Sequence, residues 1–175
     1  VAMNIDLKRK KTKKKLMKQI DINIKISVCQ LEELSADEQA LIKTAIEATK
    51  NSYSPYSHFS VGAALLLENG EMVMGANQEN AAYPSGLCAE RSAIFAAQST
   101  RPDQPIKALA IAARNGGGLM KQPIVPCGAC RQVVLEIEDR YKKPVRILLY
   151  GTDGIYIINT IKDLLPLQFI GESMK

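Results

Sequence analysis

The chain has 175 residues, of which 46% are hydrophobic and 23% are charged, a composition typical of a globular protein and not of a disordered or fibrous one. This length is most simply one domain, and the longest apolar runs are too short to span a bilayer. The net charge of +5 arises at the N-terminus, because residues 1–18 hold eight Lys and Arg against one Asp; the mildly acidic remainder argues against a nucleic-acid-binding surface on the folded part.

The first 18 residues form a lysine-rich segment of low complexity. Like charges repel, so we predict that residues 1–18 are a disordered basic extension and that residues 19–175 form the folded domain. The extension is either an arm for nucleic acid or another anionic surface, or a solvated tail, and the second interpretation is favoured. No apolar stretch of signal-peptide type follows the positive charges, so we expect a cytoplasmic, reducing location, with no membrane and no specific nucleic-acid partner.

Two signals open the folded part. Isoleucines alternate with polar residues from Ile20 to Ile26, the period-two pattern of a short edge strand. The next signal, Ser35-Ala36-Asp37-Glu38, fits a capping box, in which the serine oxygen and the glutamate each satisfy a free amide at a helix start. We predict an edge strand at residues 20–26 and a helix that ends near Ser52.

Later segments alternate between strands and helices. Asn69-Gly70 tolerates the positive φ of a tight turn and predicts a hairpin. The link from Gly151 to Gly154 is too short for a parallel crossover, so the last two strands should be antiparallel. The fold class is therefore α/β, a three-layer α/β/α sandwich around a mixed five-stranded sheet. The expected strands are 60–67, 71–75, 106–113, 145–150 and 155–159, and the expected helices are 91–97 and 126–141.

Three of the four cysteines lie in two short segments, Cys88-Ala-Glu-Arg and Pro-Cys127-Gly-Ala-Cys130-Arg-Gln. Residues three apart in the first turn of a helix project to the same side, so Cys127 and Cys130 can grip one ion. Cys88 also opens a helix, and the partial positive charge of a helix N-terminus lowers thiol pKa values. Zinc is the metal that suits thiolates in a reducing compartment, so the sequence predicts one Zn²⁺ held by three cysteines.

Three protein ligands leave a fourth zinc position open for water, which distinguishes a catalytic site from a structural one. Glu90, two residues after Cys88, can reach that water as general acid and base without binding the metal. The alternative is a closed site with Cys29 as fourth ligand. Cys29 follows Val28 in a strand-to-turn segment, where a lone cysteine is most often a small buried hydrophobe, so the open site is favoured.

Taken together, these motifs resemble those of the cytidine deaminases, a family of small homotetrameric pyrimidine-salvage enzymes. Zinc deaminases share a ligand-x-Glu segment and a later Pro-Cys-x-x-Cys. The N-terminus before about residue 35 and the polar Gln78 depart from the compact family pattern. The resemblance covers about residues 40–170 through Ser54-Pro55-Tyr56-Ser57-His58-Phe59-Ser60-Val61-Gly62-Ala63-Ala64, Asn77-Gln78-Glu79-Asn80-Ala81-Ala82-Tyr83, both cysteine segments and Leu164-Leu165-Pro166.

The resemblance implies hydrolytic deamination of cytidine and 2′-deoxycytidine to uridine and 2′-deoxyuridine plus ammonia. It assigns zinc binding to Cys88, Cys127 and Cys130. Glu90 would take a proton from the attacking water and deliver it to N3 of cytosine and then to the departing amine. The substrate contacts it implies are Phe59 on the base, Asn77 and Glu79 on the ribose hydroxyls, Ala89 beside Cys88, and Phe169, which resembles an aromatic residue that reaches a neighbouring subunit's active site in this family.

Arg91 has a separate predicted role. Three thiolates on Zn²⁺ give a net charge of −1, which makes a bound water less acidic, and a guanidinium that donates to a thiolate withdraws part of that charge. The alternatives are a deaminase for deoxycytidylate, for a blasticidin-like nucleoside or for a base in nucleic acid, and a non-catalytic zinc-stabilised binding module. Antiparallel final strands and Glu79 near the sugar favour a free nucleoside, and Glu90 favours catalysis.

Overall fold

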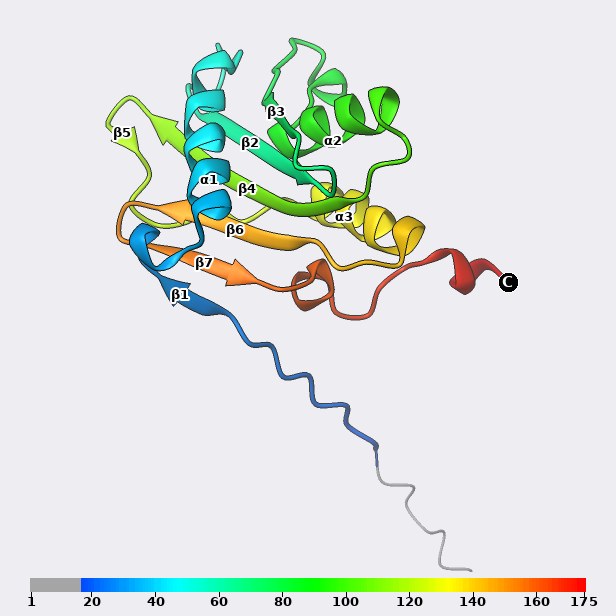
Figure 1. Cartoon of the computed structure of the whole chain (residues 1–175). Helices are drawn as coiled ribbons and strands as arrows, with labels where there is room; N and C mark the ends of the chain where they lie inside the picture. Colours follow the sequence, from blue (N-terminus) through cyan, green and yellow to red (C-terminus); the bar gives the residue numbers. More distant parts are fainter. Residues whose placement is uncertain (1–16) are drawn as a thin grey trace, which may run out of the picture.

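The computed structural model describes residues 17–175, so the disorder predicted for residues 1–18 falls almost wholly outside the described residues. Three helices and seven strands, joined by loops and short 3₁₀ turns, make up this part of the chain (Figure 1). None of its helices is long and apolar enough to cross a membrane. The helices are α1 (Ala36–Ala48), α2 (Ala89–Thr100) and α3 (Gly128–Tyr141), and the strands are β1 (Ser27–Cys29), β2 (Ser60–Leu67), β3 (Met72–Ala76), β4 (Ile106–Asn115), β5 (Gly118–Leu119), β6 (Arg146–Gly151) and β7 (Gly154–Ile158).

The strands form one mixed sheet in the order β1-β7-β6-β4-β2-β3, with β5 added on β4. β4 and β6 are parallel and are connected through α3, whereas the other neighbouring pairs are antiparallel. The hairpin predicted at Asn69-Gly70 joins β2 to β3, and the final two strands are antiparallel as predicted. The predicted number of five strands is too low, because β1 and β5 are too short to carry a clear alternation.

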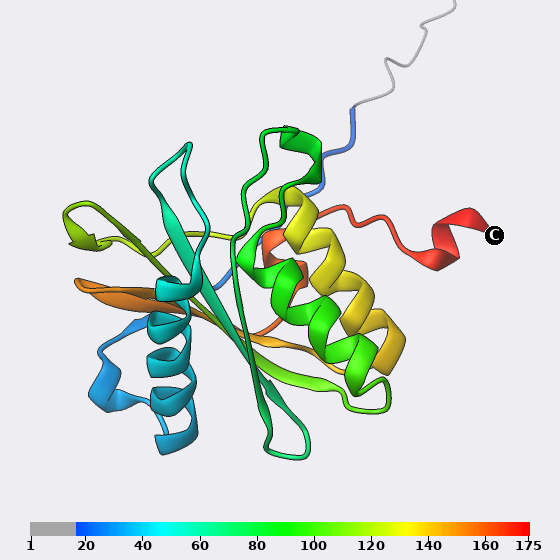
Figure 2. The same ribbon diagram turned by 90° about the horizontal axis from the view of Figure 1, so that it is seen from above.

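Helices cover both faces of the sheet, which confirms the predicted three layers. α1 lies on one face, and α2 and α3 lie side by side on the other (Figure 2). Successive side chains of a strand point to opposite faces, so Ala64 and Leu65 of β2 belong to different cores. The core under α1 includes Leu41, Ile42, Ala45, Ala110 and Leu148. The core under α2 and α3 includes Ile94, Leu109, Val134, Leu135 and Leu149.

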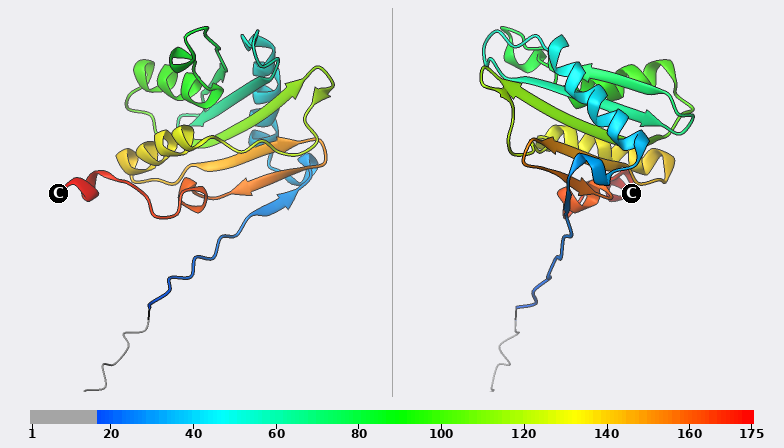
Figure 3. Two further views of the ribbon diagram at one scale, coloured as in Figure 1. Left: turned by 180° about the vertical axis from the view of Figure 1, so that it is seen from behind. Right: turned by 60° about the vertical axis from the view of Figure 1, so that its left-hand side comes forward.

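The edge strand predicted at residues 20–26 is wrong in position. The ladder between β1 and β7 starts with Ser27 opposite Ile157, and β7 ends one residue later at Ile158. The chain then enters a 3₁₀ turn at Ile161–Leu164, so β7 does not extend far enough to pair with the isoleucines. Residues 17–26 instead continue from β1 as an extended segment that leads away from the sheet (Figures 1 and 3).

The predicted capping box at the start of α1 is confirmed. The amide of Glu38 donates to Ser35 Oγ over 3.4 Å, and the amide of Ser35 donates to Glu38 Oε2 over 3.1 Å. α1 ends at Ala48, and a 3₁₀ turn at Thr49–Asn51 carries the helical path on to the predicted end near Ser52.

Two glycines allow the helices to approach the sheet closely. A Cβ atom on Gly62 would overlap the carbonyl oxygen of Ala45 on α1, and a Cβ atom on Gly75 would overlap the amide nitrogen of Ala93 on α2. These contacts are with backbone, so rotation of a side chain cannot relieve them. Gly75 therefore sets how closely the helix that begins at the first cysteine segment packs on β3.

Gly75→Ala is expected to lower the free energy of unfolding by about 1–3 kcal/mol, because the added methyl group forces α2 away from β3. Gly116→Ala is the matched control, since a Cβ atom at that exposed turn would meet no atom within 4 Å, and its effect should stay below about 0.5 kcal/mol. Urea denaturation of the two variants checks this. Equal losses of stability would contradict the proposed close packing.

Candidate metal centre and active site

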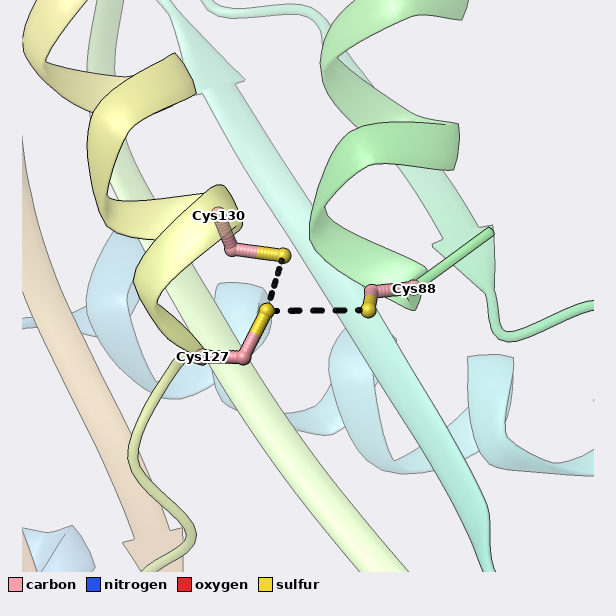
Figure 4. A group of neighbouring side chains, drawn as sticks. All are labelled: Cys88, Cys127 and Cys130. Carbon is pink, nitrogen blue, oxygen red and sulfur yellow. Dashed lines mark hydrogen bonds between the residues drawn. The ribbon is translucent and has the colours of Figure 1, made fainter. Parts of the chain in front are cut away.

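Three cysteines from distant segments meet where α2 and α3 begin (Figure 4). Cys88 and Cys127 occupy the N-cap positions of the two helices, although neither side chain caps its helix with a hydrogen bond. Cys130 is fully buried in the first turn of α3. The Sγ atoms of Cys88 and Cys127 are 3.8 Å apart, those of Cys127 and Cys130 are 3.4 Å apart, and all three lie within 4.8 Å of one another.

This spacing fits a zinc ion. Thiolates bound at about 2.3 Å in a tetrahedral arrangement lie about 3.8 Å from one another. Cys29 is not a member of the group. It packs against the core under α1, on the opposite face of the sheet from α2 and α3. The donor set within the described residues is therefore three thiolates, as predicted, and it fits one zinc ion per chain with a coordination position left open.

Three thiols at these distances do not ionise independently. Hydrogen bonds with Cys130, Arg91 and Cys127 together lower the pKa of Cys88 to about 5, and the one with Cys130 contributes most. The neighbouring Cys88 thiolate and burial raise the pKa of Cys130. One thiolate thus forms readily and makes the next harder to form. A divalent cation supplies the positive charge that all three thiolates need.

Arg91 contributes a second positive charge to this cluster. Its Nη2 atom donates to Cys88 Sγ over 3.4 Å, and this hydrogen bond raises the pKa of the guanidinium. Nε of Arg91 is buried and has no hydrogen-bond partner within residues 17–175. This contact between guanidinium and thiolate is the one through which Arg91 is predicted to withdraw negative charge from the zinc ligands.

Glu90 lies in the first turn of α2 and is only 5% exposed. Burial raises the pKa of its carboxyl group, and the charge of Cys88 raises it further, whereas a hydrogen bond with Cys130 lowers it. Glu90 stands in the same helical turn whose N-cap position Cys88 occupies. A buried carboxyl that both holds and releases a proton suits a general acid and base.

A cavity of about 560 Å³ opens beside Cys88 and Arg91. Its size lies within the range of sites that enclose small ligands. Two aromatic rings in its wall, Tyr56 and Tyr83, pack edge to face with centroids 6.0 Å apart. The lining residues are Tyr56, Ser57, Asn77, Gln78, Glu79, Asn80, Tyr83, Gly86, Leu87, Cys88 and Arg91.

Of the residues predicted to contact the ribose, Glu79 lies in the cavity wall. Hydrogen bonds from Tyr56 and Ser57 hold its side chain in place. Its carboxylate accepts hydrogen bonds from the amides of Tyr56 and Ser57, at 2.9 Å and 3.2 Å. It also accepts a short hydrogen bond from the hydroxyl of Ser57. The bond from the Ser57 hydroxyl is the main cause of the lowered pKa of Glu79. The carboxylate is thus oriented as an acceptor with capacity for one more donor.

Asn77, the other predicted ribose contact, also lines the cavity. Its side chain forms hydrogen bonds with the loop at residues 52–61. Oδ1 accepts from the amide of Val61 at 2.8 Å and from the hydroxyl of Ser52 at 2.6 Å. Nδ2 donates to the carbonyl of Phe59 at 3.0 Å. One hydrogen of that amide group is left for a ligand.

The remaining predicted contacts lie outside the cavity wall. Phe59 is half-buried and its carbonyl accepts the hydrogen bond from Asn77, and Ala89 is fully buried at the start of α2. Phe169 is 59% exposed on the C-terminal segment. Sequence reasoning gave no role to Ser57, because its partner Glu79 lies 22 residues further along the chain.

Sequence reasoning also missed how the C-terminal segment is attached to the metal helix. Arg131 Nε donates to the carbonyl of Pro126, and its Nη1 donates to the carbonyl of Leu164, both over 2.8 Å. Gln132 Nε2 donates to the carbonyl of Phe169 over 2.9 Å. The helix that carries two of the cysteines thus also holds residues 164–169.

The chain matches known proteins over most of its length. Residues 35–144 match the family model described as the cytidine and deoxycytidylate deaminase zinc-binding region. A cytidine deaminase of Halalkalibacterium halodurans is 42% identical over 138 residues, which cover 79% of this chain and 98% of that protein.

Solved structures agree with this match. The crystal structure of cytidine deaminase from Burkholderia pseudomallei is 38% identical, with a TM-score of 0.64 over 74% of this chain and 97% of that one. The cytidine deaminase from Mycobacterium tuberculosis is 33% identical, with a TM-score of 0.61 over 78% and 99%. These likenesses join the three-cysteine centre to a fold and a sequence of one kind: the chain belongs to the cytidine deaminase family of zinc-dependent deaminases.

Proposed function

We propose that the chain catalyses the hydrolytic deamination of cytidine and 2′-deoxycytidine, with release of ammonia, as part of pyrimidine salvage. The observation that carries this proposal is the cysteine cluster, whose member Cys88 lines a cavity of about 560 Å³, together with the buried carboxyl group of Glu90 two residues after Cys88. The relatives named above are cytidine deaminases and match this chain over more than two thirds of its length.

A free nucleoside fits the cavity better than a nucleotide. Among the described residues that line it, Arg91 is the one with a positive charge, and its guanidinium donates to a thiolate. Glu79, which also lines the cavity, adds a negative charge and is held by Ser57. A phosphate group would meet a carboxylate there without a cation to balance it.

Zinc, when bound by Cys88, Cys127 and Cys130, supplies a Lewis acid that makes a water molecule a nucleophile near neutral pH. Glu90 accepts the proton that this water loses as its oxygen bonds to C4 of cytosine, and donates it to N3. Glu90 then takes the proton of the new hydroxyl group and donates it to the exocyclic amine. The C4–N bond breaks, ammonia leaves and the uracil carbonyl forms. Arg91 keeps the thiolates from over-neutralising the cation.

The sugar and the base of the substrate are held by side chains near the cavity. Glu79 accepts a hydrogen bond from one sugar hydroxyl, and the free hydrogen of the Asn77 amide donates to a sugar oxygen. Phe59 packs along the base, and Ala89 lies next to the reacting carbon. The place of Glu79 and Asn77 in the cavity wall supports their roles. The roles of Phe59 and Ala89, which do not line the cavity, rest on the family resemblance alone.

We further propose a homotetramer in which Phe169 of one subunit reaches the cavity of its neighbour, in the cytoplasm. Phe169 is 59% exposed and does not line the cavity of its own chain, while Gln132 fixes its backbone. An exposed ring on an anchored segment is suited to contact another subunit. Free thiolate ligands favour a reducing compartment. On this view the domain comprises residues 19–175, with residues 1–18 as a basic extension.

The activity is tested by release of ammonia from cytidine, deoxycytidine and deoxycytidylate. Both nucleosides should be deaminated and deoxycytidylate should be turned over poorly. Dialysis against a zinc chelator should abolish turnover, and added Zn²⁺ should restore it. Turnover of deoxycytidylate alone would replace the nucleoside assignment with a nucleotide one.

Glu90→Gln should keep the bound zinc and the fold while lowering kcat by about 10²–10⁴-fold, because an amide cannot shuttle protons. Glu136→Gln, at an exposed position of α3, is the control and should leave kcat unchanged. Metal content and turnover are measured on the same samples. Full activity in Glu90→Gln would exclude the proposed acid and base.

Arg91→Ala should lower kcat or zinc affinity by about 10–100-fold, because the thiolate charge is no longer balanced. If charge is the cause, replacing one thiolate with a neutral ligand should compensate. The double variant Arg91→Ala with Cys88→His is therefore expected to recover much of the lost kcat, measured against both single variants. A double variant worse than Arg91→Ala alone would show that Arg91 acts through packing.

A further inference from the structure

The extended segment at residues 20–26 has the surface of a β-strand without a partner. Its isoleucines are 82%, 53%, 40% and 45% exposed at positions 20, 22, 24 and 26. The next residue on the same face of the strand, Val28, is 63% exposed. Within residues 17–175, β1 pairs with β7 along one edge only, so in this part of the chain its other edge offers unpaired amide and carbonyl groups. Such an edge is a template for another strand.

We propose that residues 20–26 pair with the same residues of a second copy of this chain, as an antiparallel β-ribbon centred on Asn23. The sequence Ile-Asp-Ile-Asn-Ile-Lys-Ile reads alike from both ends apart from the exchange of Asp21 and Lys25. In an antiparallel pair centred on Asn23, isoleucines stand opposite isoleucines, and each Asp21 stands opposite a Lys25. The segment is complementary to itself in both apolar pattern and charge.

The charges select this register over its neighbours. Registers that keep the isoleucines on one face differ by shifting the centre by one residue. A centre at Ile22 places Asp21 opposite Asn23, and a centre at Ile24 places Asp21 opposite Ser27. Neither shifted register opposes charges of different sign. The centre at Asn23 makes two Asp–Lys pairs in each ribbon, one from each copy of Asp21.

The direction of pairing follows from the N-terminal charge. The sequence before Met17 is rich in lysine, and two such segments repel one another. An antiparallel ribbon places the two copies of Met17 at opposite ends, whereas a parallel ribbon would place them together. The antiparallel arrangement is therefore favoured.

The ribbon continues an existing sheet. In the same register, residues 17–19 of one copy stand opposite Cys29, Val28 and Ser27 of the other. They would cover the free edge of β1, which is already paired with β7 on its other side. A two-stranded ribbon alone is barely stable, and a third strand at each end removes that weakness. Two copies would then share one continuous sheet.

This interface lies outside the region that carries the family. The family match begins at residue 35, and the Halalkalibacterium relative is covered almost entirely by 79% of this chain. The proposed ribbon does not depend on deaminase activity or on the proposed tetramer. Its test must therefore measure the pairing of residues 20–26 alone.

Disulfide trapping in the full chain measures this pairing directly. Directly opposed residues have Cβ atoms about 4.5–5.5 Å apart, close to the separation that a disulfide needs. Asn23→Cys, in a Cys29→Ser background, should give a covalent dimer under mild oxidation. Asp21→Cys is the matched control, because its two copies would lie four residues apart along the ribbon, about 14 Å. Asp21→Cys chains should crosslink only when mixed with Lys25→Cys chains.

The charge pairs are tested separately by sedimentation of uncrosslinked chains. Asp21→Lys and Lys25→Asp each place like charges opposite one another and should weaken the association by about tenfold or more. The double exchange Asp21→Lys with Lys25→Asp should restore it. Crosslinking through Asp21→Cys alone, no crosslinking through Asn23→Cys, or a double exchange weaker than either single variant would overturn the proposal.

Discussion

The active site depends on keeping three sulfur atoms within 4.8 Å of one another while all of them carry negative charge in the zinc complex. Two helix N-termini, one guanidinium and one divalent cation oppose that charge. Each of these needs its own piece of structure. α2 and α3 must start side by side, Arg91 must stand one turn into α2, and β3 must let α2 come close through Gly75. The sheet and its two helices on one face can be understood as the support for this arrangement.

The part of the cavity wall formed by Glu79 and Asn77 depends on hydrogen bonds within the protein and not on balanced charges. Glu79 and Asn77 are fixed by hydrogen bonds to the loop at residues 52–61, so neither has to become ordered when a ligand binds. Such prior ordering lowers the entropic cost of association. It also limits what can be recognised, because most of the hydrogen-bonding capacity of both side chains is already used within the protein. The cavity therefore has a few well-placed polar groups and no dense array of charges.

Much of this could be predicted from the sequence because the signals are local. A few consecutive residues are enough to identify the capping box at Ser35, the turn at Asn69-Gly70 and the two cysteine segments. The isoleucine strand was misplaced because its partner had to come from β7, and only the end of β7 at Ile158 excludes that pairing. The role of Ser57 was missed for a similar reason, since its partner Glu79 lies 22 residues further along the chain. β5 was missed because a strand of two residues is too short to show an alternation.

The N-cap positions of Cys88 and Cys127 have a consequence for the lifetime of the protein. A serine or aspartate at an N-cap stabilises a helix by about 1 kcal/mol, whereas these two thiols make no capping hydrogen bond. The first turns of α2 and α3 therefore rely on whatever binds the sulfur atoms. By mass action, a ligand of the folded state stabilises it more as its free concentration rises. Bound zinc is thus expected to make these helix ends open less often to proteases.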